Sequence, residues 1–270
     1  MKILQLINLG SKKLAYKNIL SHKLDSEILL SKILKKKREE IILGSNQKLN
    51  KKQINQYNEL IYRRSLNEPI AYILEQKEFW SKIFYVNRFT LIPRPETELM
   101  IYELIKIFKD KRVQILDIGT GSGCILISLL AELKNCSGDG IDISPNTIKT
   151  AKINAKVHNI CNKIKFYKKS FNDHFTKKYD LIVSNPPYIK RVELKNLDND
   201  IKHFEPKIAL DGGNDGLDLI KKVIYKAKDI LKLNGKLAIE IGNKQHLKVS
   251  KILINNNFKI IRAIKDYKNN

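Results

Sequence analysis

The sequence predicts an α/β protein, with a small helical domain followed by a larger domain built on a mainly parallel sheet. In residues 1–75 apolar side chains recur at helical spacing, whereas from residue 93 onward short apolar runs alternate with helical patterns. Alternating strands and helices are joined by right-handed crossovers and form parallel sheets. Residues 76–92 contain short, strand-like runs with aromatic side chains. We therefore expect a β-hairpin linker between a helical domain 1–75 and a second domain 93–270.

Within the first domain the helical spacing is clearest between residues 26 and 34. One face of a helix there would carry Ile28, Leu29, Ile33 and Leu34. Gly44 and the polar residues that follow it predict a break, and residues 49–64 predict the next helix.

The composition is typical of a globular protein located in a reducing compartment. The 270 residues are 43% hydrophobic, enough for one large and one small domain. No run approaches the eighteen or so apolar residues of a membrane helix, and the start of the chain lacks the pattern of a signal peptide. The three cysteines, Cys124, Cys136 and Cys161, are too few and too scattered for disulfides or a zinc cluster. We therefore expect a cytoplasmic protein without membrane attachment and without a metal.

The formal net charge of +23 raises the question of a nucleic-acid partner. Lysine accompanies abundant Ile and Asn, which is typical of a biased genome composition, and runs such as residues 35–38 fit a solvated helix face. We favour that interpretation over a dedicated nucleic-acid site. A basic surface can still steer an acidic protein partner, and we expect the protein itself to be a monomer.

A glycine turn at the start of the second domain indicates a nucleotide-like ligand. The apolar run 113–118 leads into Gly119, Thr120, Gly121, Ser122 and Gly123, and a helical pattern follows. Such a strand, turn and helix N-terminus brings backbone N–H groups close to a ligand. Asp142 lies about 20 residues further on, at the spacing of a carboxylate that binds ribose hydroxyls. The glycines lack the full dinucleotide spacing and no basic residue adjoins Asp142 for a 2′-phosphate, so S-adenosylmethionine fits best.

A second motif, Asn185, Pro186, Pro187 and Tyr188, directly follows the apolar run 181–184. Ligands of open α/β sheets bind at the carboxyl ends of the strands. The side-chain oxygen of Asn185 and the carbonyl of Pro186 can each accept one hydrogen of a planar NH2 group, while the Tyr188 ring packs on its flat face. The motif suits an amide or an exocyclic amine. The alternative is a strand that simply ends at two prolines.

Taken together, seven motifs resemble those of the peptide chain release factor glutamine methyltransferases over nearly the whole length of the chain. They are Glu68–Tyr72, Glu78–Trp80, Leu91–Glu98, Leu116–Gly123, Ser184–Ile189, Phe204–Pro206 and Ala209–Gly213. The resemblance implies a Rossmann-like class I methyltransferase domain with a small N-terminal helical domain for substrate recognition. It implies methyl transfer from S-adenosylmethionine to the side-chain nitrogen (N5) of the glutamine in the Gly-Gly-Gln motif of class I release factors.

Two other substrates and one other class of function stay open. A sister group that methylates a glutamine of a ribosomal protein shares much of the pattern. The Asn-Pro-Pro-Tyr motif also serves methyltransferases of adenine or guanine amino groups, which need a base-reading domain or a flipping pocket. The N-terminal helices give no sign of one. A binding protein without catalysis is the third possibility, and it would fail to bind S-adenosylmethionine.

The sequence and the resemblance together assign the cofactor residues. We expect Asp142 to hold the ribose, the loop Gly119 to Gly123 the methionine end, and Phe171 to stack on adenine. At position 170 the family usually has an acidic residue where this chain has Ser170, which can serve adenine only weakly. Asn185 touches the cofactor as well. Asp117 either faces the methionine ammonium or is a buried turn residue.

For the substrate amide, alignment is the main contribution we expect from the protein. Acceptors at Asn185 and Pro186 fix the two N–H bonds and favour the positive charge that grows on nitrogen, while Pro187 and Tyr188 confine the amide. The sequence shows no obvious general base. The resemblance adds Arg94 as a polar contact to the substrate, although Pro95 also fits the first turn of a helix without any function.

The end of the chain departs from the family pattern. The resemblance predicts a further strand beyond Asn270, inserted antiparallel near the edge of the sheet. Either the chain is truncated or the edge is completed in another way. The cofactor loops belong to the other half of the sheet, so we expect stability to suffer before specificity.

Overall fold

The computed structural model describes residues 1–265, which divide into two compact units. The first holds residues 1–75 together with 198–204, and the second holds the rest. The first unit contains α1 (Ile3–Tyr16), α2 (His22–Leu34), α3 (Arg38–Leu43), α4 (Lys51–Ser65) and α5 (Ile70–Leu74). The short helix α9 (Asn199–Phe204) is grouped with it by its contacts.

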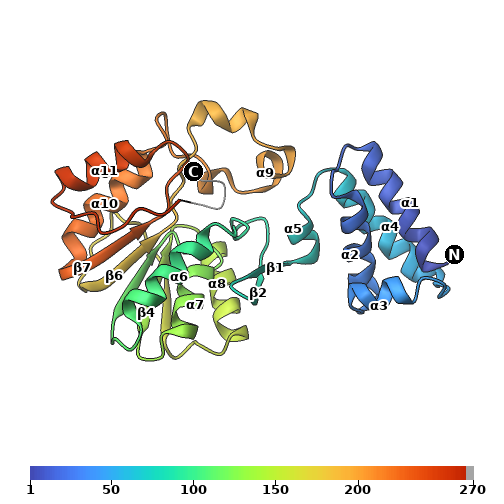
Figure 1. Cartoon of the computed structure of the whole chain (residues 1–270), viewed down its shortest axis with the longest axis horizontal. Helices are drawn as coiled ribbons and strands as arrows, with labels where there is room; N and C mark the ends of the chain where they lie inside the picture. Colours follow the sequence, from blue (N-terminus) through green and yellow to red (C-terminus); the bar gives the residue numbers. More distant parts are fainter. Residues whose placement is uncertain (266–270) are drawn as a thin grey trace. The chain divides into compact units, whose positions relative to one another are not determined.

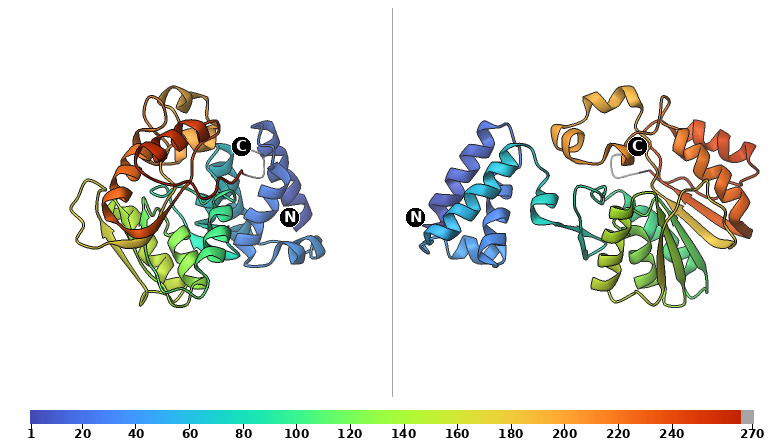
Figure 2. Two further views of the ribbon diagram at one scale, coloured as in Figure 1. Left: turned by 60° about the vertical axis from the view of Figure 1, so that its left-hand side comes forward. Right: turned by 180° about the vertical axis from the view of Figure 1, so that it is seen from behind.

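In the helical unit α1, α2 and α4 pack around one apolar core (Figure 2). A Cβ on Gly10 of α1 would overlap the Tyr57 hydroxyl, so glycine allows the helices to approach closely. That hydroxyl is hydrogen-bonded to Ser26 of α2 in the same core. Helix α2 buries Leu29 as the sequence predicts, but it buries Leu30 as well. The next helix begins at Lys51 rather than residue 49 because the Asn50 side chain caps it, accepting the Gln53 N–H at 2.9 Å.

The second unit opens with a hairpin of β1 (Gln76–Phe79) and β2 (Lys82–Tyr85). Its two turn residues, Trp80 and Ser81, have φ angles of 51° and 52°. Two consecutive residues with positive φ form the type I′ turn that matches the twist of a hairpin. An irregular segment follows as far as α6 (Thr97–Phe108).

The core of this unit is a five-stranded parallel sheet in the order β5-β4-β3-β6-β7. The strands are β3 (Gln114–Ile118), β4 (Ser137–Asp142), β5 (Ile164–Lys168), β6 (Tyr179–Ser184) and β7 (Leu231–Ile239). The helices between them are α7 (Cys124–Glu132), α8 (Pro145–Val157) and α10 (Asp218–Ile230), and α11 (His246–Asn255) follows β7. Two short 3-10 helices, η1 (Arg191–Asn196) and η2 (Lys207–Ala209), flank α9.

Helices cover both faces of this sheet (Figure 1). On one face α6, α7 and α8 pack against strand residues such as Ile115, and on the other α10 packs against the neighbouring Leu116. This alternation is the period of two that a strand buried on both faces requires. The chain runs from β3 outward to β5 and then returns to β6. The strand order therefore reverses between β3 and β6, which is where a doubly wound sheet binds its ligand.

As far as residue 265 the sheet gains no strand after β7. Phe258 packs into the apolar cluster on the α10 side of the sheet. Arg262 forms an ion pair with Glu103 of α6, which lies on the other face. The segment between these two residues thus passes from one face of the sheet to the other. Within the described residues no helix is long and apolar enough to cross a bilayer.

Candidate active site

The glycine loop follows β3 at the carboxyl edge of the sheet. Gly119, Gly121 and Gly123 have φ angles of 74°, 57° and 80°, in the left-handed region that favours glycine. Gly123 is the N-cap of α7, and a Cβ there would lie 3.3 Å from the Cβ of Ala151 in α8. The loop thus places the positive end of α7 at the edge of the sheet, as a cradle for a ligand with negative groups requires.

Asp142 lies beside this loop, at the end of the neighbouring strand β4. Its Oδ2 accepts the Gly121 N–H at 3.3 Å and its Oδ1 accepts the Ser144 N–H at 3.0 Å. Burial raises the pKa of Asp142, while these backbone N–H groups lower it. The Lys169 N–H donates to the Asp142 carbonyl at 2.9 Å, so the turn after β5 adjoins the same place.

Asp117, the penultimate residue of β3, is fully buried beneath the loop. Its Oδ2 accepts the Thr120 hydroxyl at 2.7 Å, whereas Oδ1 lacks a partner with hydrogen-bond geometry among the described residues. Burial raises the pKa of Asp117 to about 7, and the charge of Asp142 adds to this. The Thr120 hydroxyl and the backbone N–H of Leu126 lower it. A buried carboxylate oxygen that lacks a hydrogen-bond partner among residues 1–265 is of the kind that a ligand ammonium group satisfies.

Asn185 follows β6 across the switch point. Its Nδ2 donates to Thr97 Oγ1 at 3.4 Å, and that hydroxyl donates to Glu240 Oε2 at 2.6 Å. Because Nδ2 is directed at Thr97, Oδ1 is the atom of this amide that remains to accept from a ligand. The role of Asn185 as an acceptor for a substrate amide stays a prediction, with Oδ1 as the acceptor atom.

Tyr188 contributes to the same cluster through its hydroxyl. The Tyr188 O–H donates to Glu240 Oε1 at 3.3 Å. Burial raises the pKa of Glu240, and hydrogen bonds from Thr97, Tyr188 and Asn185 oppose that increase. Burial also raises the pKa of Tyr188, and the Glu240 carboxylate raises it further. One half-buried carboxylate thus organises the hydroxyls and the amide at this end of the sheet.

The turn that carries Tyr188 is supported from behind. Gln245 Nε2 donates to the Tyr188 carbonyl at 3.0 Å and to the Gly216 carbonyl at 3.1 Å. The Ile189 N–H donates to Leu210 at 3.1 Å, and its carbonyl accepts the Gly212 N–H at 2.8 Å. Asp211, within the motif Ala209–Gly213, thus forms an isolated parallel β-bridge with Ile189, directly after Tyr188.

Arg94 and Pro95 differ in part from expectation. Arg94 forms an ion pair of 2.5 Å with Glu205, whose other oxygen accepts the Ile92 N–H at 3.1 Å. Its guanidinium is thus held by the protein itself, with 30% of the side chain exposed. The prediction that Pro95 occupies the first turn of the helix is wrong. Helix α6 begins at Thr97, because Arg94 and Pro95 accept the Thr97 and Glu98 N–H groups in a separate turn.

Ser170 and Phe171 lie in the turn after β5. Ser170 Oγ accepts the Asn172 N–H at 3.1 Å, and the Ser170 N–H donates to Asp173 Oδ2 at 2.8 Å. The half-buried Phe171 packs into the apolar cluster between the sheet and α10. Its ring thus contributes to the core, which the sequence pattern alone did not predict.

Sequence reasoning gave no role to Thr97, Glu205 or Glu240. Glu240 follows the apolar end of β7, and a charged residue directly after a strand, at the carboxyl edge of the sheet, was the available signal. Thr97 and Glu205 stood inside quoted motifs without a partner, because their partners are 143 and 111 residues away along the chain. Among residues 1–265 no cluster of His, Cys, Asp or Glu is arranged to hold a metal ion.

Comparison with known proteins identifies two family domains. Residues 5–74 match the PrmC N-terminal domain, and residues 96–202 match the methyltransferase small domain. With the strand order and the glycine loop, these matches define a class I methyltransferase of Rossmann-like fold.

Relatives of known name are similar over most of the chain. The release factor glutamine methyltransferase of Buchnera aphidicola from Schizaphis graminum is 43% identical, over 91% of this chain and 89% of that protein. The protein of the same name from Fusobacterium nucleatum is 38% identical, over 92% and 71%. A ribosomal protein L11 methylase structure from Lactobacillus delbrueckii subsp. bulgaricus is 22% identical over 66% of this chain and 76% of that chain, with a TM-score of 0.49. The chain belongs to the release factor glutamine methyltransferase family.

Proposed function

We propose that this protein methylates N5 of the glutamine in the Gly-Gly-Gln motif of class I release factors, in the cytoplasm, with S-adenosylmethionine as the methyl donor. The observation that carries the proposal is the chain of contacts from Glu240 through Thr97 to Asn185, which leaves the amide oxygen of Asn185 as an acceptor. The family name of the relatives supports the same substrate.

The residues present fit the cofactor. The Asp117 oxygen without a partner suits the methionine ammonium, the N–H groups at the start of α7 suit its carboxylate, and Asp142 suits the ribose hydroxyls. We propose that the turn of Ser170 and Phe171, which follows the Lys169 N–H bonded to the Asp142 carbonyl, contacts adenine. When bound, S-adenosylmethionine supplies an electrophilic methyl group on a sulfonium.

The protein's part in the reaction is to orient a poor nucleophile. In our proposal Asn185 Oδ1 and the Pro186 carbonyl each accept a hydrogen bond from one N–H group of the glutamine amide. These two hydrogen bonds turn the lone pair of the nitrogen toward the methyl group. The cofactor held by these residues would supply the methyl group for the new N–C bond, and its sulfur would keep the electron pair of the C–S bond. The nitrogen gains positive charge, which the two acceptors and the nearby Glu240 carboxylate stabilise. The N-alkylated amide then loses one proton to water.

The decisive experiment is a substrate panel. Purified protein is incubated with labelled S-adenosylmethionine and a class I release factor, a ribosomal protein, or RNA and DNA, and the products are mapped by mass spectrometry. We expect one methyl group on the glutamine of the Gly-Gly-Gln loop, and none on a release factor in which that glutamine is replaced by glutamate. Methylation of a ribosomal-protein glutamine or of a base amino group, with an unmodified release factor, would contradict the proposal.

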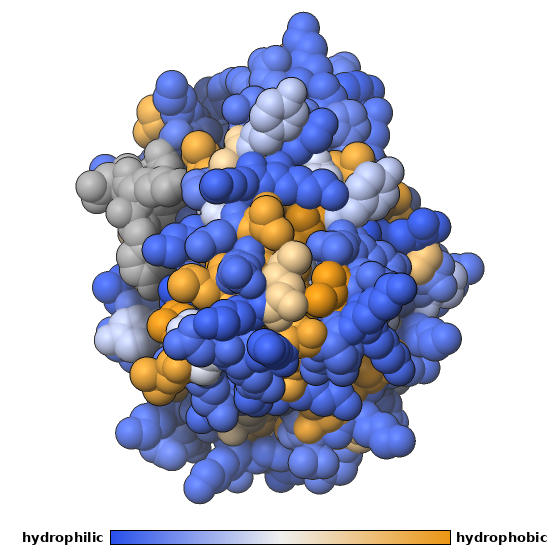
Figure 3. Space-filling model, turned by 90° about the vertical axis from the view of Figure 1, so that its right-hand side faces the viewer, coloured by the Kyte–Doolittle hydropathy of each residue, from blue (hydrophilic) through white to orange (hydrophobic). Residues whose placement is uncertain are grey.

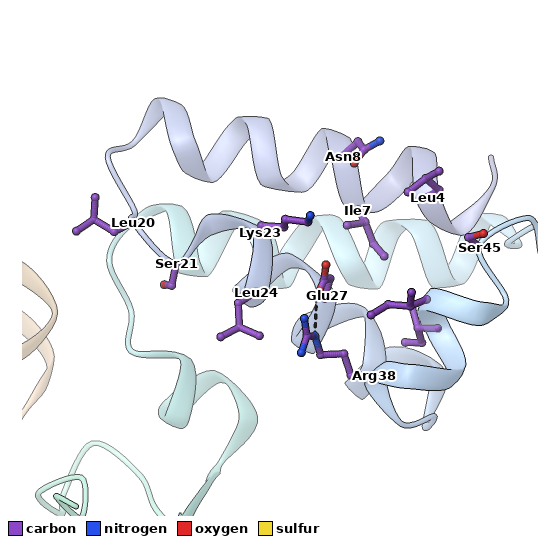
Figure 4. A pocket seen from close by; sticks show the side chains of 12 residues that line it. Leu4, Ile7, Asn8, Leu20, Ser21, Lys23, Leu24, Glu27, Arg38 and Ser45 are labelled. Atoms are coloured by element: carbon purple, nitrogen blue, oxygen red, sulfur yellow. Dashed lines mark hydrogen bonds and ion pairs between the residues drawn. The ribbon is translucent and has the colours of Figure 1, made fainter.

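We further propose that the helical unit docks the release factor through a groove of its own. A cavity of about 580 Å³ opens between α1, the start of α2 and α3 (Figure 4). Six of the twelve residues that line it are large and apolar, namely Leu4, Ile7, Leu20, Leu24, Ile41 and Ile42, and the other six are polar or charged. Leu20 is 98% exposed and Leu24 is 44% exposed, which is unusual for large apolar side chains beside a cavity.

The net positive charge of residues 1–75 favours an acidic protein segment as the occupant of this groove. Residues 1–75 carry fifteen Lys and Arg against seven Asp and Glu. Two of the acidic residues, Asp25 and Glu27, are buried in ion pairs with Arg64 and Arg38. The face of the molecule at this end is mostly hydrophilic with apolar side chains gathered at its centre (Figure 3). A nucleic acid would need phosphate contacts and stacking rings, but no aromatic residue lines the groove.

The groove can be tested separately from catalysis. Leu20→Asp should raise the KM for full-length release factor about tenfold, because it places a charge where we expect an apolar anchor, and leave the rate with a short Gly-Gly-Gln peptide unchanged. Tyr16→Asp is the matched control, since Tyr16 is 85% exposed in α1 but does not line the groove. Equal KM values for Leu20→Asp and Tyr16→Asp would contradict the proposal that this groove docks the release factor. Competition between RNA and the release factor for the groove would contradict it as well.

A further inference from the structure

One face of α8 fastens the segment that follows the hairpin turn. Four polar side chains, spaced three or four residues apart along the helix, bind residues 83–89. The contacts are Thr147 Oγ1 to the Phe89 carbonyl at 2.9 Å, Asn87 Nδ2 to Thr150 Oγ1 at 2.9 Å, Asn154 to Tyr85, and His158 Nε2 with the Ile83 carbonyl at 3.0 Å. That spacing places all four on one side of the helix.

Asn154 differs from the other three because it also reaches the cofactor loop. Its Oδ1 accepts the Tyr85 N–H at 2.7 Å, and its Nδ2 donates to the Tyr85 carbonyl at 2.9 Å. The same Nδ2 donates its second hydrogen to the Ser122 carbonyl at 2.8 Å. The side chain is fully buried. A single planar amide thus joins strand β2 of the hairpin to the glycine loop.

The geometry of an amide makes this junction stiff. The two hydrogens of Nδ2 lie in one plane at a fixed angle, so neither carbonyl can move far without losing its donor. A buried carbonyl that loses its donor is costly, because no water replaces the bond. One turn earlier on α8, Ala151 packs against Gly123. The loop is therefore held by α8 at two consecutive residues.

We propose that Asn154 is a positioning residue that couples the cofactor loop to the linker hairpin. The inference rests on the proposed binding of S-adenosylmethionine by residues 119–123. A loop fixed by cofactor makes Ser122 a fixed acceptor, which holds the Asn154 amide and with it both polar groups of Tyr85. Coupling of this kind is reciprocal, so loosening Tyr85 must weaken cofactor binding by the same factor.

Cofactor affinity gives the first test. The probe is S-adenosylhomocysteine, measured by calorimetry on the whole chain without release factor. Asn154→Leu, which keeps the number and branching of the side-chain heavy atoms and removes all three bonds, should weaken binding about tenfold, the value of one or two buried hydrogen bonds. Asn87→Ala is the matched control, because it removes a bond between α8 and the same segment without contact to the loop, and its affinity should stay within twofold.

Hydrogen exchange gives a second test, because a merely structural role of Asn154 would not produce the result that we expect. In the wild-type protein S-adenosylhomocysteine should slow exchange of the Tyr85 amide as well as of residues 119–124. Asn154→Asp keeps the acceptor for the Tyr85 N–H but loses the donor to Ser122, so the ligand should no longer slow Tyr85. This variant also serves if Asn154→Leu fails to fold.

The outcomes separate the two proposals. Unchanged affinity in Asn154→Leu, or no effect of ligand on Tyr85 in the wild-type protein, overturns the coupling alone. A wild-type protein that does not bind S-adenosylhomocysteine overturns both the coupling and the proposed cofactor. Methyl transfer to a substrate other than release factor would leave the coupling as it stands.

Discussion

Thr97 Oγ1 lies 2.6 Å from Glu240 Oε2, although 143 residues separate the two along the chain. The contact joins the first residue of α6 to the residue directly after β7. The hydroxyl also accepts from Asn185, so it links the half-buried Glu240 carboxylate to the amide that we propose to bind the substrate.

Thr97→Val tests this link because valine has the shape of threonine without its hydroxyl. We expect single-turnover methyl transfer at saturating cofactor to fall by about tenfold to a hundredfold, since the Asn185 amide loses its orienting partner. Thr97→Ser should restore most of the rate. Equal rates for the valine and serine variants would show that the hydroxyl does not orient Asn185.

Glu240 should make methyl transfer depend on pH. Burial raises its pKa, so its proton is bound at higher pH than is usual for a glutamate. The proposed role needs the carboxylate, and the rate should therefore fall as the pH is lowered through that raised pKa. Glu240→Gln should be slower by about tenfold at high pH and should lack this dependence. A glutamine variant with the wild-type pH profile would assign the titration to another group.

Asn185→Ala removes the acceptor itself. Methyl transfer should fall by about two to three orders of magnitude, as loss of one positioned polar group typically causes. The fold should survive because Asn185 lies outside the apolar core. Cofactor binding must be measured separately and rates compared at saturation. Turnover near the wild-type rate would mean that the Asn-Pro-Pro-Tyr turn is structural.

Asp142→Ala concerns the cofactor. Binding should weaken by about 1 to 3 kcal/mol because the ribose hydroxyls lose a charged acceptor. The Gly121 and Ser144 N–H groups lose the same acceptor, so the melting temperature of the free protein serves as the control. Calorimetry with unchanged affinity would remove Asp142 from the site.

Asp117 should make stability fall with rising pH. Its pKa is raised to about 7 in the folded protein, whereas an unfolded aspartate titrates near 3.9. Between those values the folded state binds a proton that the unfolded state has lost, so the free energy of unfolding declines from about pH 4 to about pH 7 and then levels.

Asp117→Asn removes this contribution. The difference in free energy of unfolding between the variant and the wild type should grow in favour of asparagine from pH 5 to pH 8, on the order of 1 to 4 kcal/mol. Denaturant titrations at several pH values measure it. We expect the same variant to bind S-adenosylmethionine more weakly. A difference that does not change with pH would indicate that Asp117 titrates at its ordinary pKa.

Local patterns predicted the local parts of the site. The glycine turn around Gly121 and the carboxylate of Asp142 lie only 21 residues apart along the chain. Residues this close in sequence end neighbouring strands, so a local pattern was enough to predict that they meet. The parallel α/β sheet followed from the alternation of strands and helices, the class I methyltransferase fold followed from the family resemblance, and both are confirmed. Glu240 was missed because its partners are set by the register of β6 and β7, which no local pattern records. Phe171 shows a second limit of prediction from sequence, because an aromatic residue beside a predicted site can also pack into the apolar core.

The division of the site along the chain bears on the order in which it is made. Residues 114–168 contain the glycine loop, Asp142 and three paired strands, all contiguous in sequence. The proposed substrate half instead gathers Thr97, Asn185 and Glu240 across the length of the domain. Contacts between residues far apart in sequence require a long loop to close, and the entropy of closing it is lost before the contacts can stabilise the fold. Such contacts therefore form late in folding. On the ribosome, the chain would complete its cofactor cradle first and become competent for catalysis only after β7 had emerged.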